Sequence, residues 1–153
     1  MSKLKKELSQ AARHMMSGVV QIRVEGYIEE NIQSVLNPAI RIPGRWTGSG
    51  FFVSYKGLEG YIVTNAHVVR NASKIEVRSM LTSEEKFSAQ IVGLVKQLDP
   101  DVALIRLLDS ELVRFKQLAI KPIEYLELRE GPSPSRGEEI KAIGYPMGMV
   151  EPN

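Results

Sequence analysis

The sequence contains no cysteine, and this absence excludes two kinds of site at once. Disulfide bonds and thiolate metal ligands both require the thiol group. Only two histidines are present, His14 and His67, so a zinc site built from imidazole ligands is also disfavoured. We therefore expect no metal and no cofactor.

Long apolar runs are also missing. No stretch approaches the roughly 20 apolar residues that cross a bilayer, so we expect no membrane span. The first residues include lysines, but the apolar block of about 7–15 residues typical of a secretory signal does not follow them. This pattern indicates a cytoplasmic location unless a signal has been removed.

Charge of one sign does not dominate the chain. The 20 basic and 18 acidic residues are evenly mixed, and no basic stripe occurs beyond Lys3-Leu4-Lys5-Lys6. The sequence therefore predicts no nucleic-acid binding. A hydrophobic content of 43% over 153 residues is ordinary for a globular domain with its own core.

The periodicity of apolar residues changes near residue 18. Residues 1–17 have apolar side chains at spacings of three and four, which predicts an N-terminal helix. From Val20 onward the apolar residues alternate with polar ones, the period-two pattern of half-buried strands. A hairpin over 50–64 and strands near 74–78, 86–95, 102–107 and 139–143 predict an all-β, antiparallel barrel. Residues 26–46, with two prolines, are expected to form a long surface loop.

The predicted strands define both the domains and the core. We expect a first barrel over residues 18–130 and an incomplete start of a second over 131–153, after a turn rich in proline and serine. Residues 137–148 should then pack imperfectly or recruit another chain, because an unpaired strand edge exposes donors and acceptors. Inward positions predicted from the alternation are Val20, Ile22, Phe52, Ile62, Ile75, Val77, Ile91, Val102, Leu104 and Leu107.

The residues with the most informative chemistry are His67 and Asp101. His67 follows a predicted strand that ends at Thr64, and Val68-Val69 can anchor the turn that carries it in the core. An imidazole at the rim of a sheet suits a general base, although a purely structural histidine fits the same position equally well. Asp101 precedes an apolar strand, where a carboxylate is costly unless it finds a donor such as a histidine ring. We therefore expect the two side chains to lie within hydrogen-bond reach.

Other residues compete for these roles. Asp99 lies beside Asp101 across Pro100, and only the proximity of the strand favours Asp101. Ser49 lies between two glycines, and this pattern favours close backbone approach over a nucleophile. Ser133 and Ser135 lie in the proline-rich loop with nothing to fix their rotamers, and His14 falls on the polar side of the predicted helix.

Five segments in this order resemble the HtrA/Deg family of trypsin-like serine endopeptidases. The segments are Val19-Val20-Gln21-Ile22, Gly48-Ser49-Gly50-Phe51, Gly60–Val69, Asp101-Val102-Ala103-Leu104-Ile105 and Ala142–Gly148. The resemblance covers roughly residues 18–150. It implies a double β-barrel with the active site between the barrels, with His67 as general base and Asp101 as the carboxylate that orients it.

The resemblance also implies partners and a compartment. The family acts on unfolded or peptide substrates and assembles as a homo-oligomer, often a trimer, through N-terminal segments. The resemblance therefore implies such substrates and assembly for this chain, and a periplasmic or other extracytoplasmic location.

The sequence departs from the family in one decisive respect. Its 153 residues contain no Gly-Asn-Ser-Gly-Gly stretch to supply the nucleophile and oxyanion hole, and no counterpart of the PDZ module common in the family.

Three hypotheses follow. The chain is the N-terminal part of an HtrA-like serine endopeptidase, inactive as this polypeptide alone, or a non-catalytic protease-like domain used for protein binding or oligomerisation. The third is a barrel unrelated to proteolysis, with a structural His67. A Gly-Asn-Ser-Gly-Gly segment about 70–80 residues past Asp101 in the parent reading frame favours the first, and a native stop codon after Asn153 favours the second.

Overall fold

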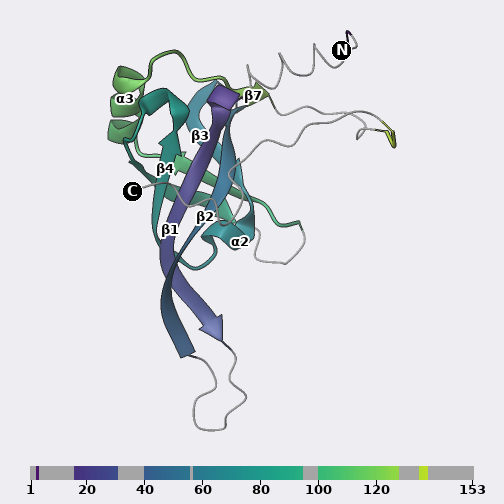
Figure 1. Cartoon of the computed structure of the whole chain (residues 1–153), viewed down its shortest axis with the longest axis vertical. Coiled ribbons are helices and arrows are strands. Elements are labelled where there is room, and N and C mark those ends of the chain that lie inside the picture. Colours follow the sequence, from purple (N-terminus) through teal and green to yellow (C-terminus); the bar gives the residue numbers. More distant parts are fainter. Residues whose placement is uncertain are drawn as a thin grey trace.

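A computed structural model describes residues 3, 16–30, 40–55, 57–94, 100–127 and 135–137. The predicted helix over 1–17 and the predicted strand over 139–143 lie almost wholly outside these ranges. The described part is mainly β-structure, with short helical segments between strands (Figure 1). None of its helices is long and apolar enough to cross a membrane.

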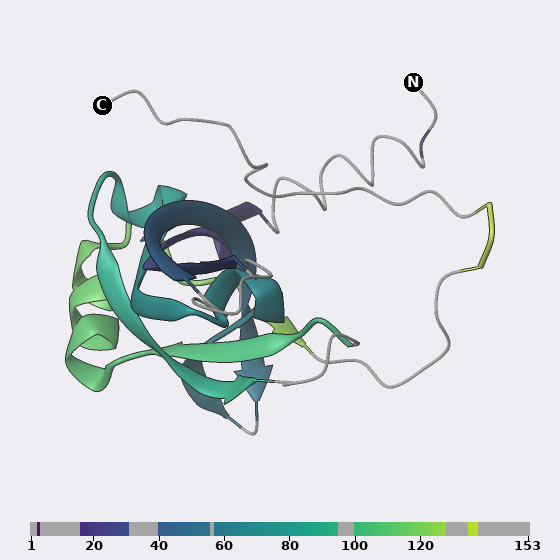
Figure 2. The same cartoon turned by 90° about the horizontal axis from the view of Figure 1, so that it is seen from below.

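The strands close into an antiparallel barrel. In chain order the elements are η1 (Met16–Gly18), β1 (Val19–Glu30), β2 (Ile40–Tyr55), β3 (Leu58–Thr64), α2 (Ala66–Val69), β4 (Ala72–Ser79), η2 (Met80–Thr82), β5 (Phe87–Leu94), β6 (Ala103–Leu107), α3 (Asp109–Leu118) and β7 (Leu126–Glu127). The strand order is β1-β4-β5-β6-β3-β2, and a β1–β2 ladder joins its two ends. Figure 2 shows this barrel from below, with β7 added in parallel to β2. The predicted all-β, antiparallel barrel is confirmed.

In β3, β4 and β6, buried residues alternate with more exposed ones. Most predicted inward positions are buried, as the alternation required: Val20, Ile22, Phe52, Ile62, Ile75, Val77 and Leu107. The predictions for Val102, Leu104 and Ile91 were wrong. In β6 the buried residues are Ala103, Ile105 and Leu107, so Leu104 belongs to the outer face, and Val102, just before the strand, is 44% exposed. Ile91 lies beside an irregularity in the β5–β6 register and is 39% exposed.

The prediction of a surface loop over 26–46 was wrong at both ends, where the structure has strands. β1 continues to Glu30 and β2 begins at Ile40, in one unbroken register from Val19↔Phe51 to Glu30↔Ile40. The β1–β4 ladder ends at Gly26↔Ala72. Beyond this point β1 and β2 continue past the barrel, paired only with each other, as a projecting ribbon (Figure 1). A proline is tolerated on such a ribbon because its outer edge needs no ladder donor.

Helix α3 had no counterpart among the predicted elements. Its single fully buried residue is Phe115, whose ring packs 5.4 Å from the Phe52 ring and 4.8 Å from the Phe87 ring, between centroids. Arg114 lies over the outer side of Phe87 and forms an ion pair with Glu111 on the same helix. Phe115 is therefore the fully buried aromatic anchor of the helix, and the partly buried Leu112 packs against the same core.

Candidate active site

His67 lies on a single helical turn directly after β3. The strand ends at the buried Thr64, whose Oγ1 donates a hydrogen bond of 2.8 Å to the carbonyl of Ser49 on β2. The chain turns at Asn65 and forms α2, with Val68 and Val69 buried and His67 exposed. The predicted turn is thus a one-turn helix, and its two valines anchor it in the core as expected.

Asp101 approaches His67 from the segment that precedes β6. Its Oδ1 accepts a hydrogen bond of 2.8 Å from the backbone N–H of His67, and its Oδ2 lies against Nδ1 of the same imidazole. Asn65 adds a third link, because its side-chain Nδ2 donates to the carbonyl of Asp101 at 3.1 Å. The structure therefore brings together the two residues singled out in the sequence; Asp99 lies outside the described residues.

These contacts determine the charge and tautomer of the pair. The hydrogen bond from the His67 ring, followed by that from the His67 backbone, holds the pKa of the Asp101 carboxyl below its ordinary value of 3.8. Asp101 is therefore a carboxylate at neutral pH. A neutral imidazole in this position keeps its proton on Nδ1 and leaves Nε2 with a free lone pair, an assignment made from the hydrogen-bond pattern. With 65% of the side chain exposed, the ring is accessible to a reacting group.

The glycines around Ser49 serve packing. A Cβ at Gly48 would lie 2.7 Å from Cγ2 of Val68, and a Cβ at Gly50 would lie 2.7 Å from Cγ2 of Ile62. The expectation that these glycines permit close backbone approach is confirmed. Ser135 is exposed, whereas Ser133 and His14 fall outside the described residues.

Two residues that hold the site were not predicted as part of it. Asn65 binds the Asp101 backbone, and the indole Nε1 of Trp46 donates a hydrogen bond of 2.7 Å to the carbonyl of Val68 in α2. Asn65 could have been suspected from its position beside His67. Trp46 is distant in sequence, and nothing in its local pattern indicates a contact with α2.

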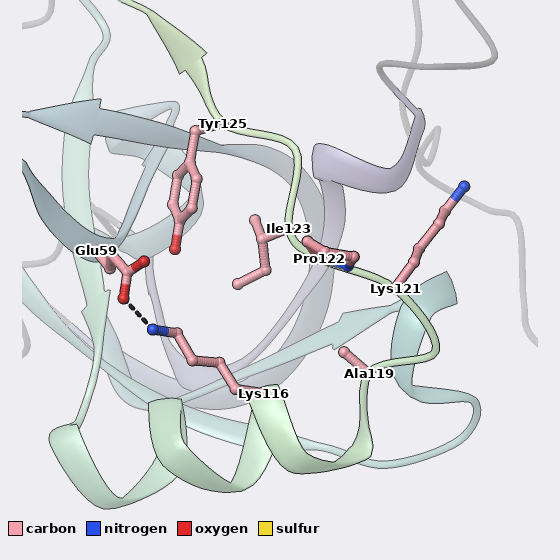
Figure 3. Close-up of a pocket in the computed structure, with 7 residues that line it drawn as sticks. All are labelled: Glu59, Lys116, Ala119, Lys121, Pro122, Ile123 and Tyr125. Atoms are coloured by element: carbon pink, nitrogen blue, oxygen red, sulfur yellow. Dashed lines mark hydrogen bonds and ion pairs between the residues drawn. The ribbon is translucent and has the colours of Figure 1, made fainter.

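A cavity of about 460 Å³ lies elsewhere on the barrel, and neither His67 nor Asp101 lines it. Its lining residues are Glu59, Lys116, Ala119, Lys121, Pro122, Ile123 and Tyr125 (Figure 3). Lys116 and Glu59 form an ion pair in it, and Lys121 points away. Burial raises the pKa of Tyr125, so its hydroxyl stays protonated at neutral pH. Tyr125 is thus not an activated nucleophile. Within the described ranges, no cluster of three or more His, Cys, Asp or Glu residues could hold a metal ion.

The fold agrees with the comparisons to known proteins. Residues 48–153, more than half of the chain, match the model of the trypsin-like peptidase domain. The chain belongs to the trypsin-like peptidase family, and its relatives place it in the HtrA/Deg group of serine proteases.

The similar curated proteins are bacterial proteases that are much longer than this chain. A probable periplasmic serine endoprotease, DegP-like, of Rickettsia prowazekii is 30% identical over 147 residues, which cover 95% of this chain and 24% of that protein. The periplasmic serine endoprotease DegP of Salmonella typhimurium is 35% identical over 104 residues, covering 68% of this chain and 18% of that protein. The chain thus spans about a quarter or less of their length. A solved HtrA-type protease with a decapeptide is 20% identical, with a TM-score of 0.48 over 65% of this chain and 32% of that chain.

Proposed function

We propose that this chain supplies the general base and the orienting carboxylate of a serine endopeptidase. The observation that supports this proposal best is the double contact of Asp101 with the backbone and the ring of His67. In peptide-bond hydrolysis, Nε2 of His67 takes the proton of a serine hydroxyl as its oxygen attacks the scissile carbonyl. The imidazolium then returns that proton to the leaving amine, and Asp101 stabilises the positive ring between the two steps.

The nucleophile is proposed to come from outside these 153 residues. The sequence has no Gly-Asn-Ser-Gly-Gly stretch, and the Gly-Ser-Gly that it does have is explained by packing against Val68 and Ile62. In this proposal residues 18–130 act as the first barrel and 131–153 as the start of a second. The polypeptide alone is then inactive, while the completed protease hydrolyses unfolded or peptide substrates.

A second candidate is a protein-binding or oligomerising domain, for example within a homotrimer. It is favoured by the projecting ribbon of β1 and β2, where large apolar side chains face solvent. Tyr27 is 43% exposed, Ile28 49% and Ile42 39%. A two-stranded ribbon is marginally stable alone, and a partner chain would cover this apolar surface.

The decisive experiment uses the gene product that carries these residues. Hydrolysis of a fluorogenic peptide and of casein would be measured for the wild type, His67→Ala and Asp101→Asn, with the exposed Gln117→Ala on α3 as control. We expect both site variants to lose on the order of 10⁴-fold or more in kcat, and the control to keep full activity. Unchanged hydrolysis in His67→Ala would refute the assignment. If the wild type is inert and resists fluorophosphonate labelling while Ile28→Ser and Ile42→Ser alter its oligomeric state, the binding function is correct.

A further inference from the structure

The carbonyl of Val68 is bound from outside its helix. Helix α2 has four residues, too few to be stable by its own hydrogen bonds, so contacts with the barrel must set its orientation. The last carbonyls of any helix have no partner within it. Val68 finds one in the indole N–H of Trp46, at 2.7 Å across 22 residues of sequence.

Two of the bonds that α2 makes with distant parts of the chain flank the imidazole. On one side, the carboxylate of Asp101 accepts from the backbone N–H of His67, which occupies the second position of α2. On the other, Trp46 donates to the carbonyl of the next residue, Val68. The helix is therefore held immediately before and after the His67 side chain. A rotation of α2 that would turn the ring away from Asp101 has to break one of these bonds.

Trp46 is itself fixed in the barrel wall. It lies on β2 opposite Val24 and packs against the buried core cluster. Its Cη2 atom occupies the space above Gly26, where a Cβ would approach it to 2.8 Å. Two residues further along β2, Gly48 brings the strand into contact with the Val68 side chain. The indole is thus packed against the core and over the backbone at Gly26.

We propose that Trp46 is a positioning residue for His67, acting through the carbonyl of Val68 to keep the imidazole on Asp101. The inference deepens the proposed function, because it assumes that His67 works as the base. The competing explanation is that Trp46 only fills the barrel wall. The two differ in one respect: positioning requires the indole N–H, whereas filling requires only the shape of the ring.

Because Trp46 is the only tryptophan in the sequence, its N–H can be removed without changing its shape. Expression with 3-benzothienylalanine in place of tryptophan substitutes sulfur for the N–H at this position alone, whereas Trp46→Phe removes the N–H together with part of the ring. Nitrogen-15 NMR on the full 153-residue chain, in a His14→Gln background with a single imidazole, would report the tautomer of His67 and the exchange of its Nδ1–H with water. Ser79→Ala is the matched control, since it removes one buried hydrogen bond, from the Leu81 N–H to Ser79 Oγ at 3.0 Å, at the far end of β4.

Both tryptophan replacements are expected to speed Nδ1–H exchange about tenfold, the effect of losing one hydrogen bond. They should also raise the pKa of Asp101 toward its ordinary value, because the ring that lowers it spends less time bound. Ser79→Ala should leave both unchanged. Unchanged exchange and an unchanged Asp101 pKa in the benzothienylalanine protein would overturn the positioning role while leaving the proposed function intact. A wild type with its ring proton on Nε2 would instead refute the base assignment, and the positioning role with it.

Discussion

Asp101 binds His67 twice, once at the backbone N–H and once at the imidazole Nδ1. A single carboxylate therefore ties the ring to its own main chain. This arrangement also satisfies one of the backbone donors that the start of α2 leaves unpaired. The carboxylate thus fixes the imidazole relative to the helical turn that carries it. Proton transfer requires such a fixed geometry.

The Asp101 contact should make stability depend on acidity below pH 4. Its folded pKa lies below the ordinary value of 3.8, so its contribution is complete above that pH and is lost as the pH falls through the folded pKa. Urea unfolding of the wild type and Asp101→Asn between pH 6 and pH 2 would measure this. We expect the wild type to be more stable at pH 6 and the difference to shrink toward pH 2. A difference that is constant with pH would contradict the charge assignment.

Gly50→Ala should destabilise the barrel. A Cβ there would lie 2.7 Å from Cγ2 of Ile62 and 2.9 Å from the carbonyl oxygen of Val63, and a backbone atom cannot move aside cheaply. We expect a loss of about 1–3 kcal/mol in unfolding free energy, as for other overpacked sites. Gly93→Ala is the control: a Cβ there meets nothing within 4 Å, so the change should stay within about 0.5 kcal/mol. Equal effects in chemical denaturation would show that the close approach is not what requires glycine.

Phe115 should contribute most of the attachment of α3. Its ring is fully buried against Phe52 and Phe87, and truncation of such a side chain costs about 3–5 kcal/mol. Val113→Ala, on the same helix but 56% exposed, should cost less than about 0.5 kcal/mol. Denaturant unfolding of both variants measures the difference. A small loss for Phe115→Ala would mean that the polar contacts of Arg114 hold the helix instead.

The barrel was predictable because its strands alternate clearly. The strand from Val20 alternates apolar and polar residues, a pattern that specifies both a strand and its inner face, and the β2–β3 hairpin has glycines on both sides of its tip. In the predicted strand over 102–107, Val102 and Leu104 were assigned to the same inner face as Leu107, because all three are apolar, although alternation puts 102 and 104 opposite 107. A strand that is apolar on both faces does not reveal which one is buried. The structure resolves this with Ala103, Ile105 and Leu107 inside.

The missed features depend on contacts between distant residues. The ribbon beyond Gly26 contains Pro43, which reads as a loop signal, yet a strand with a free edge accepts it. The bond from Trp46 to Val68 joins residues whose neighbourhood arises only when β2 packs on α2. By contrast, His67 and Asp101 could be singled out because each stands next to an apolar segment whose position in the barrel was legible. Their contact was expected and is present, and their catalytic role is the proposal.

The last prediction is that the 153-residue polypeptide hydrolyses no peptides by itself. A base and an orienting carboxylate provide no route to an acyl-enzyme without a nucleophile and an oxyanion hole. In triad enzymes, loss of the serine alone costs about as much as loss of all three residues, on the order of 10⁶ in rate. Fluorogenic-peptide assays should therefore give the same background for the wild-type chain and His67→Ala, and a fluorophosphonate should label neither. Labelling of the wild type at Ser49, Ser133 or Ser135 that disappears in His67→Ala would show that the chain contains its own nucleophile.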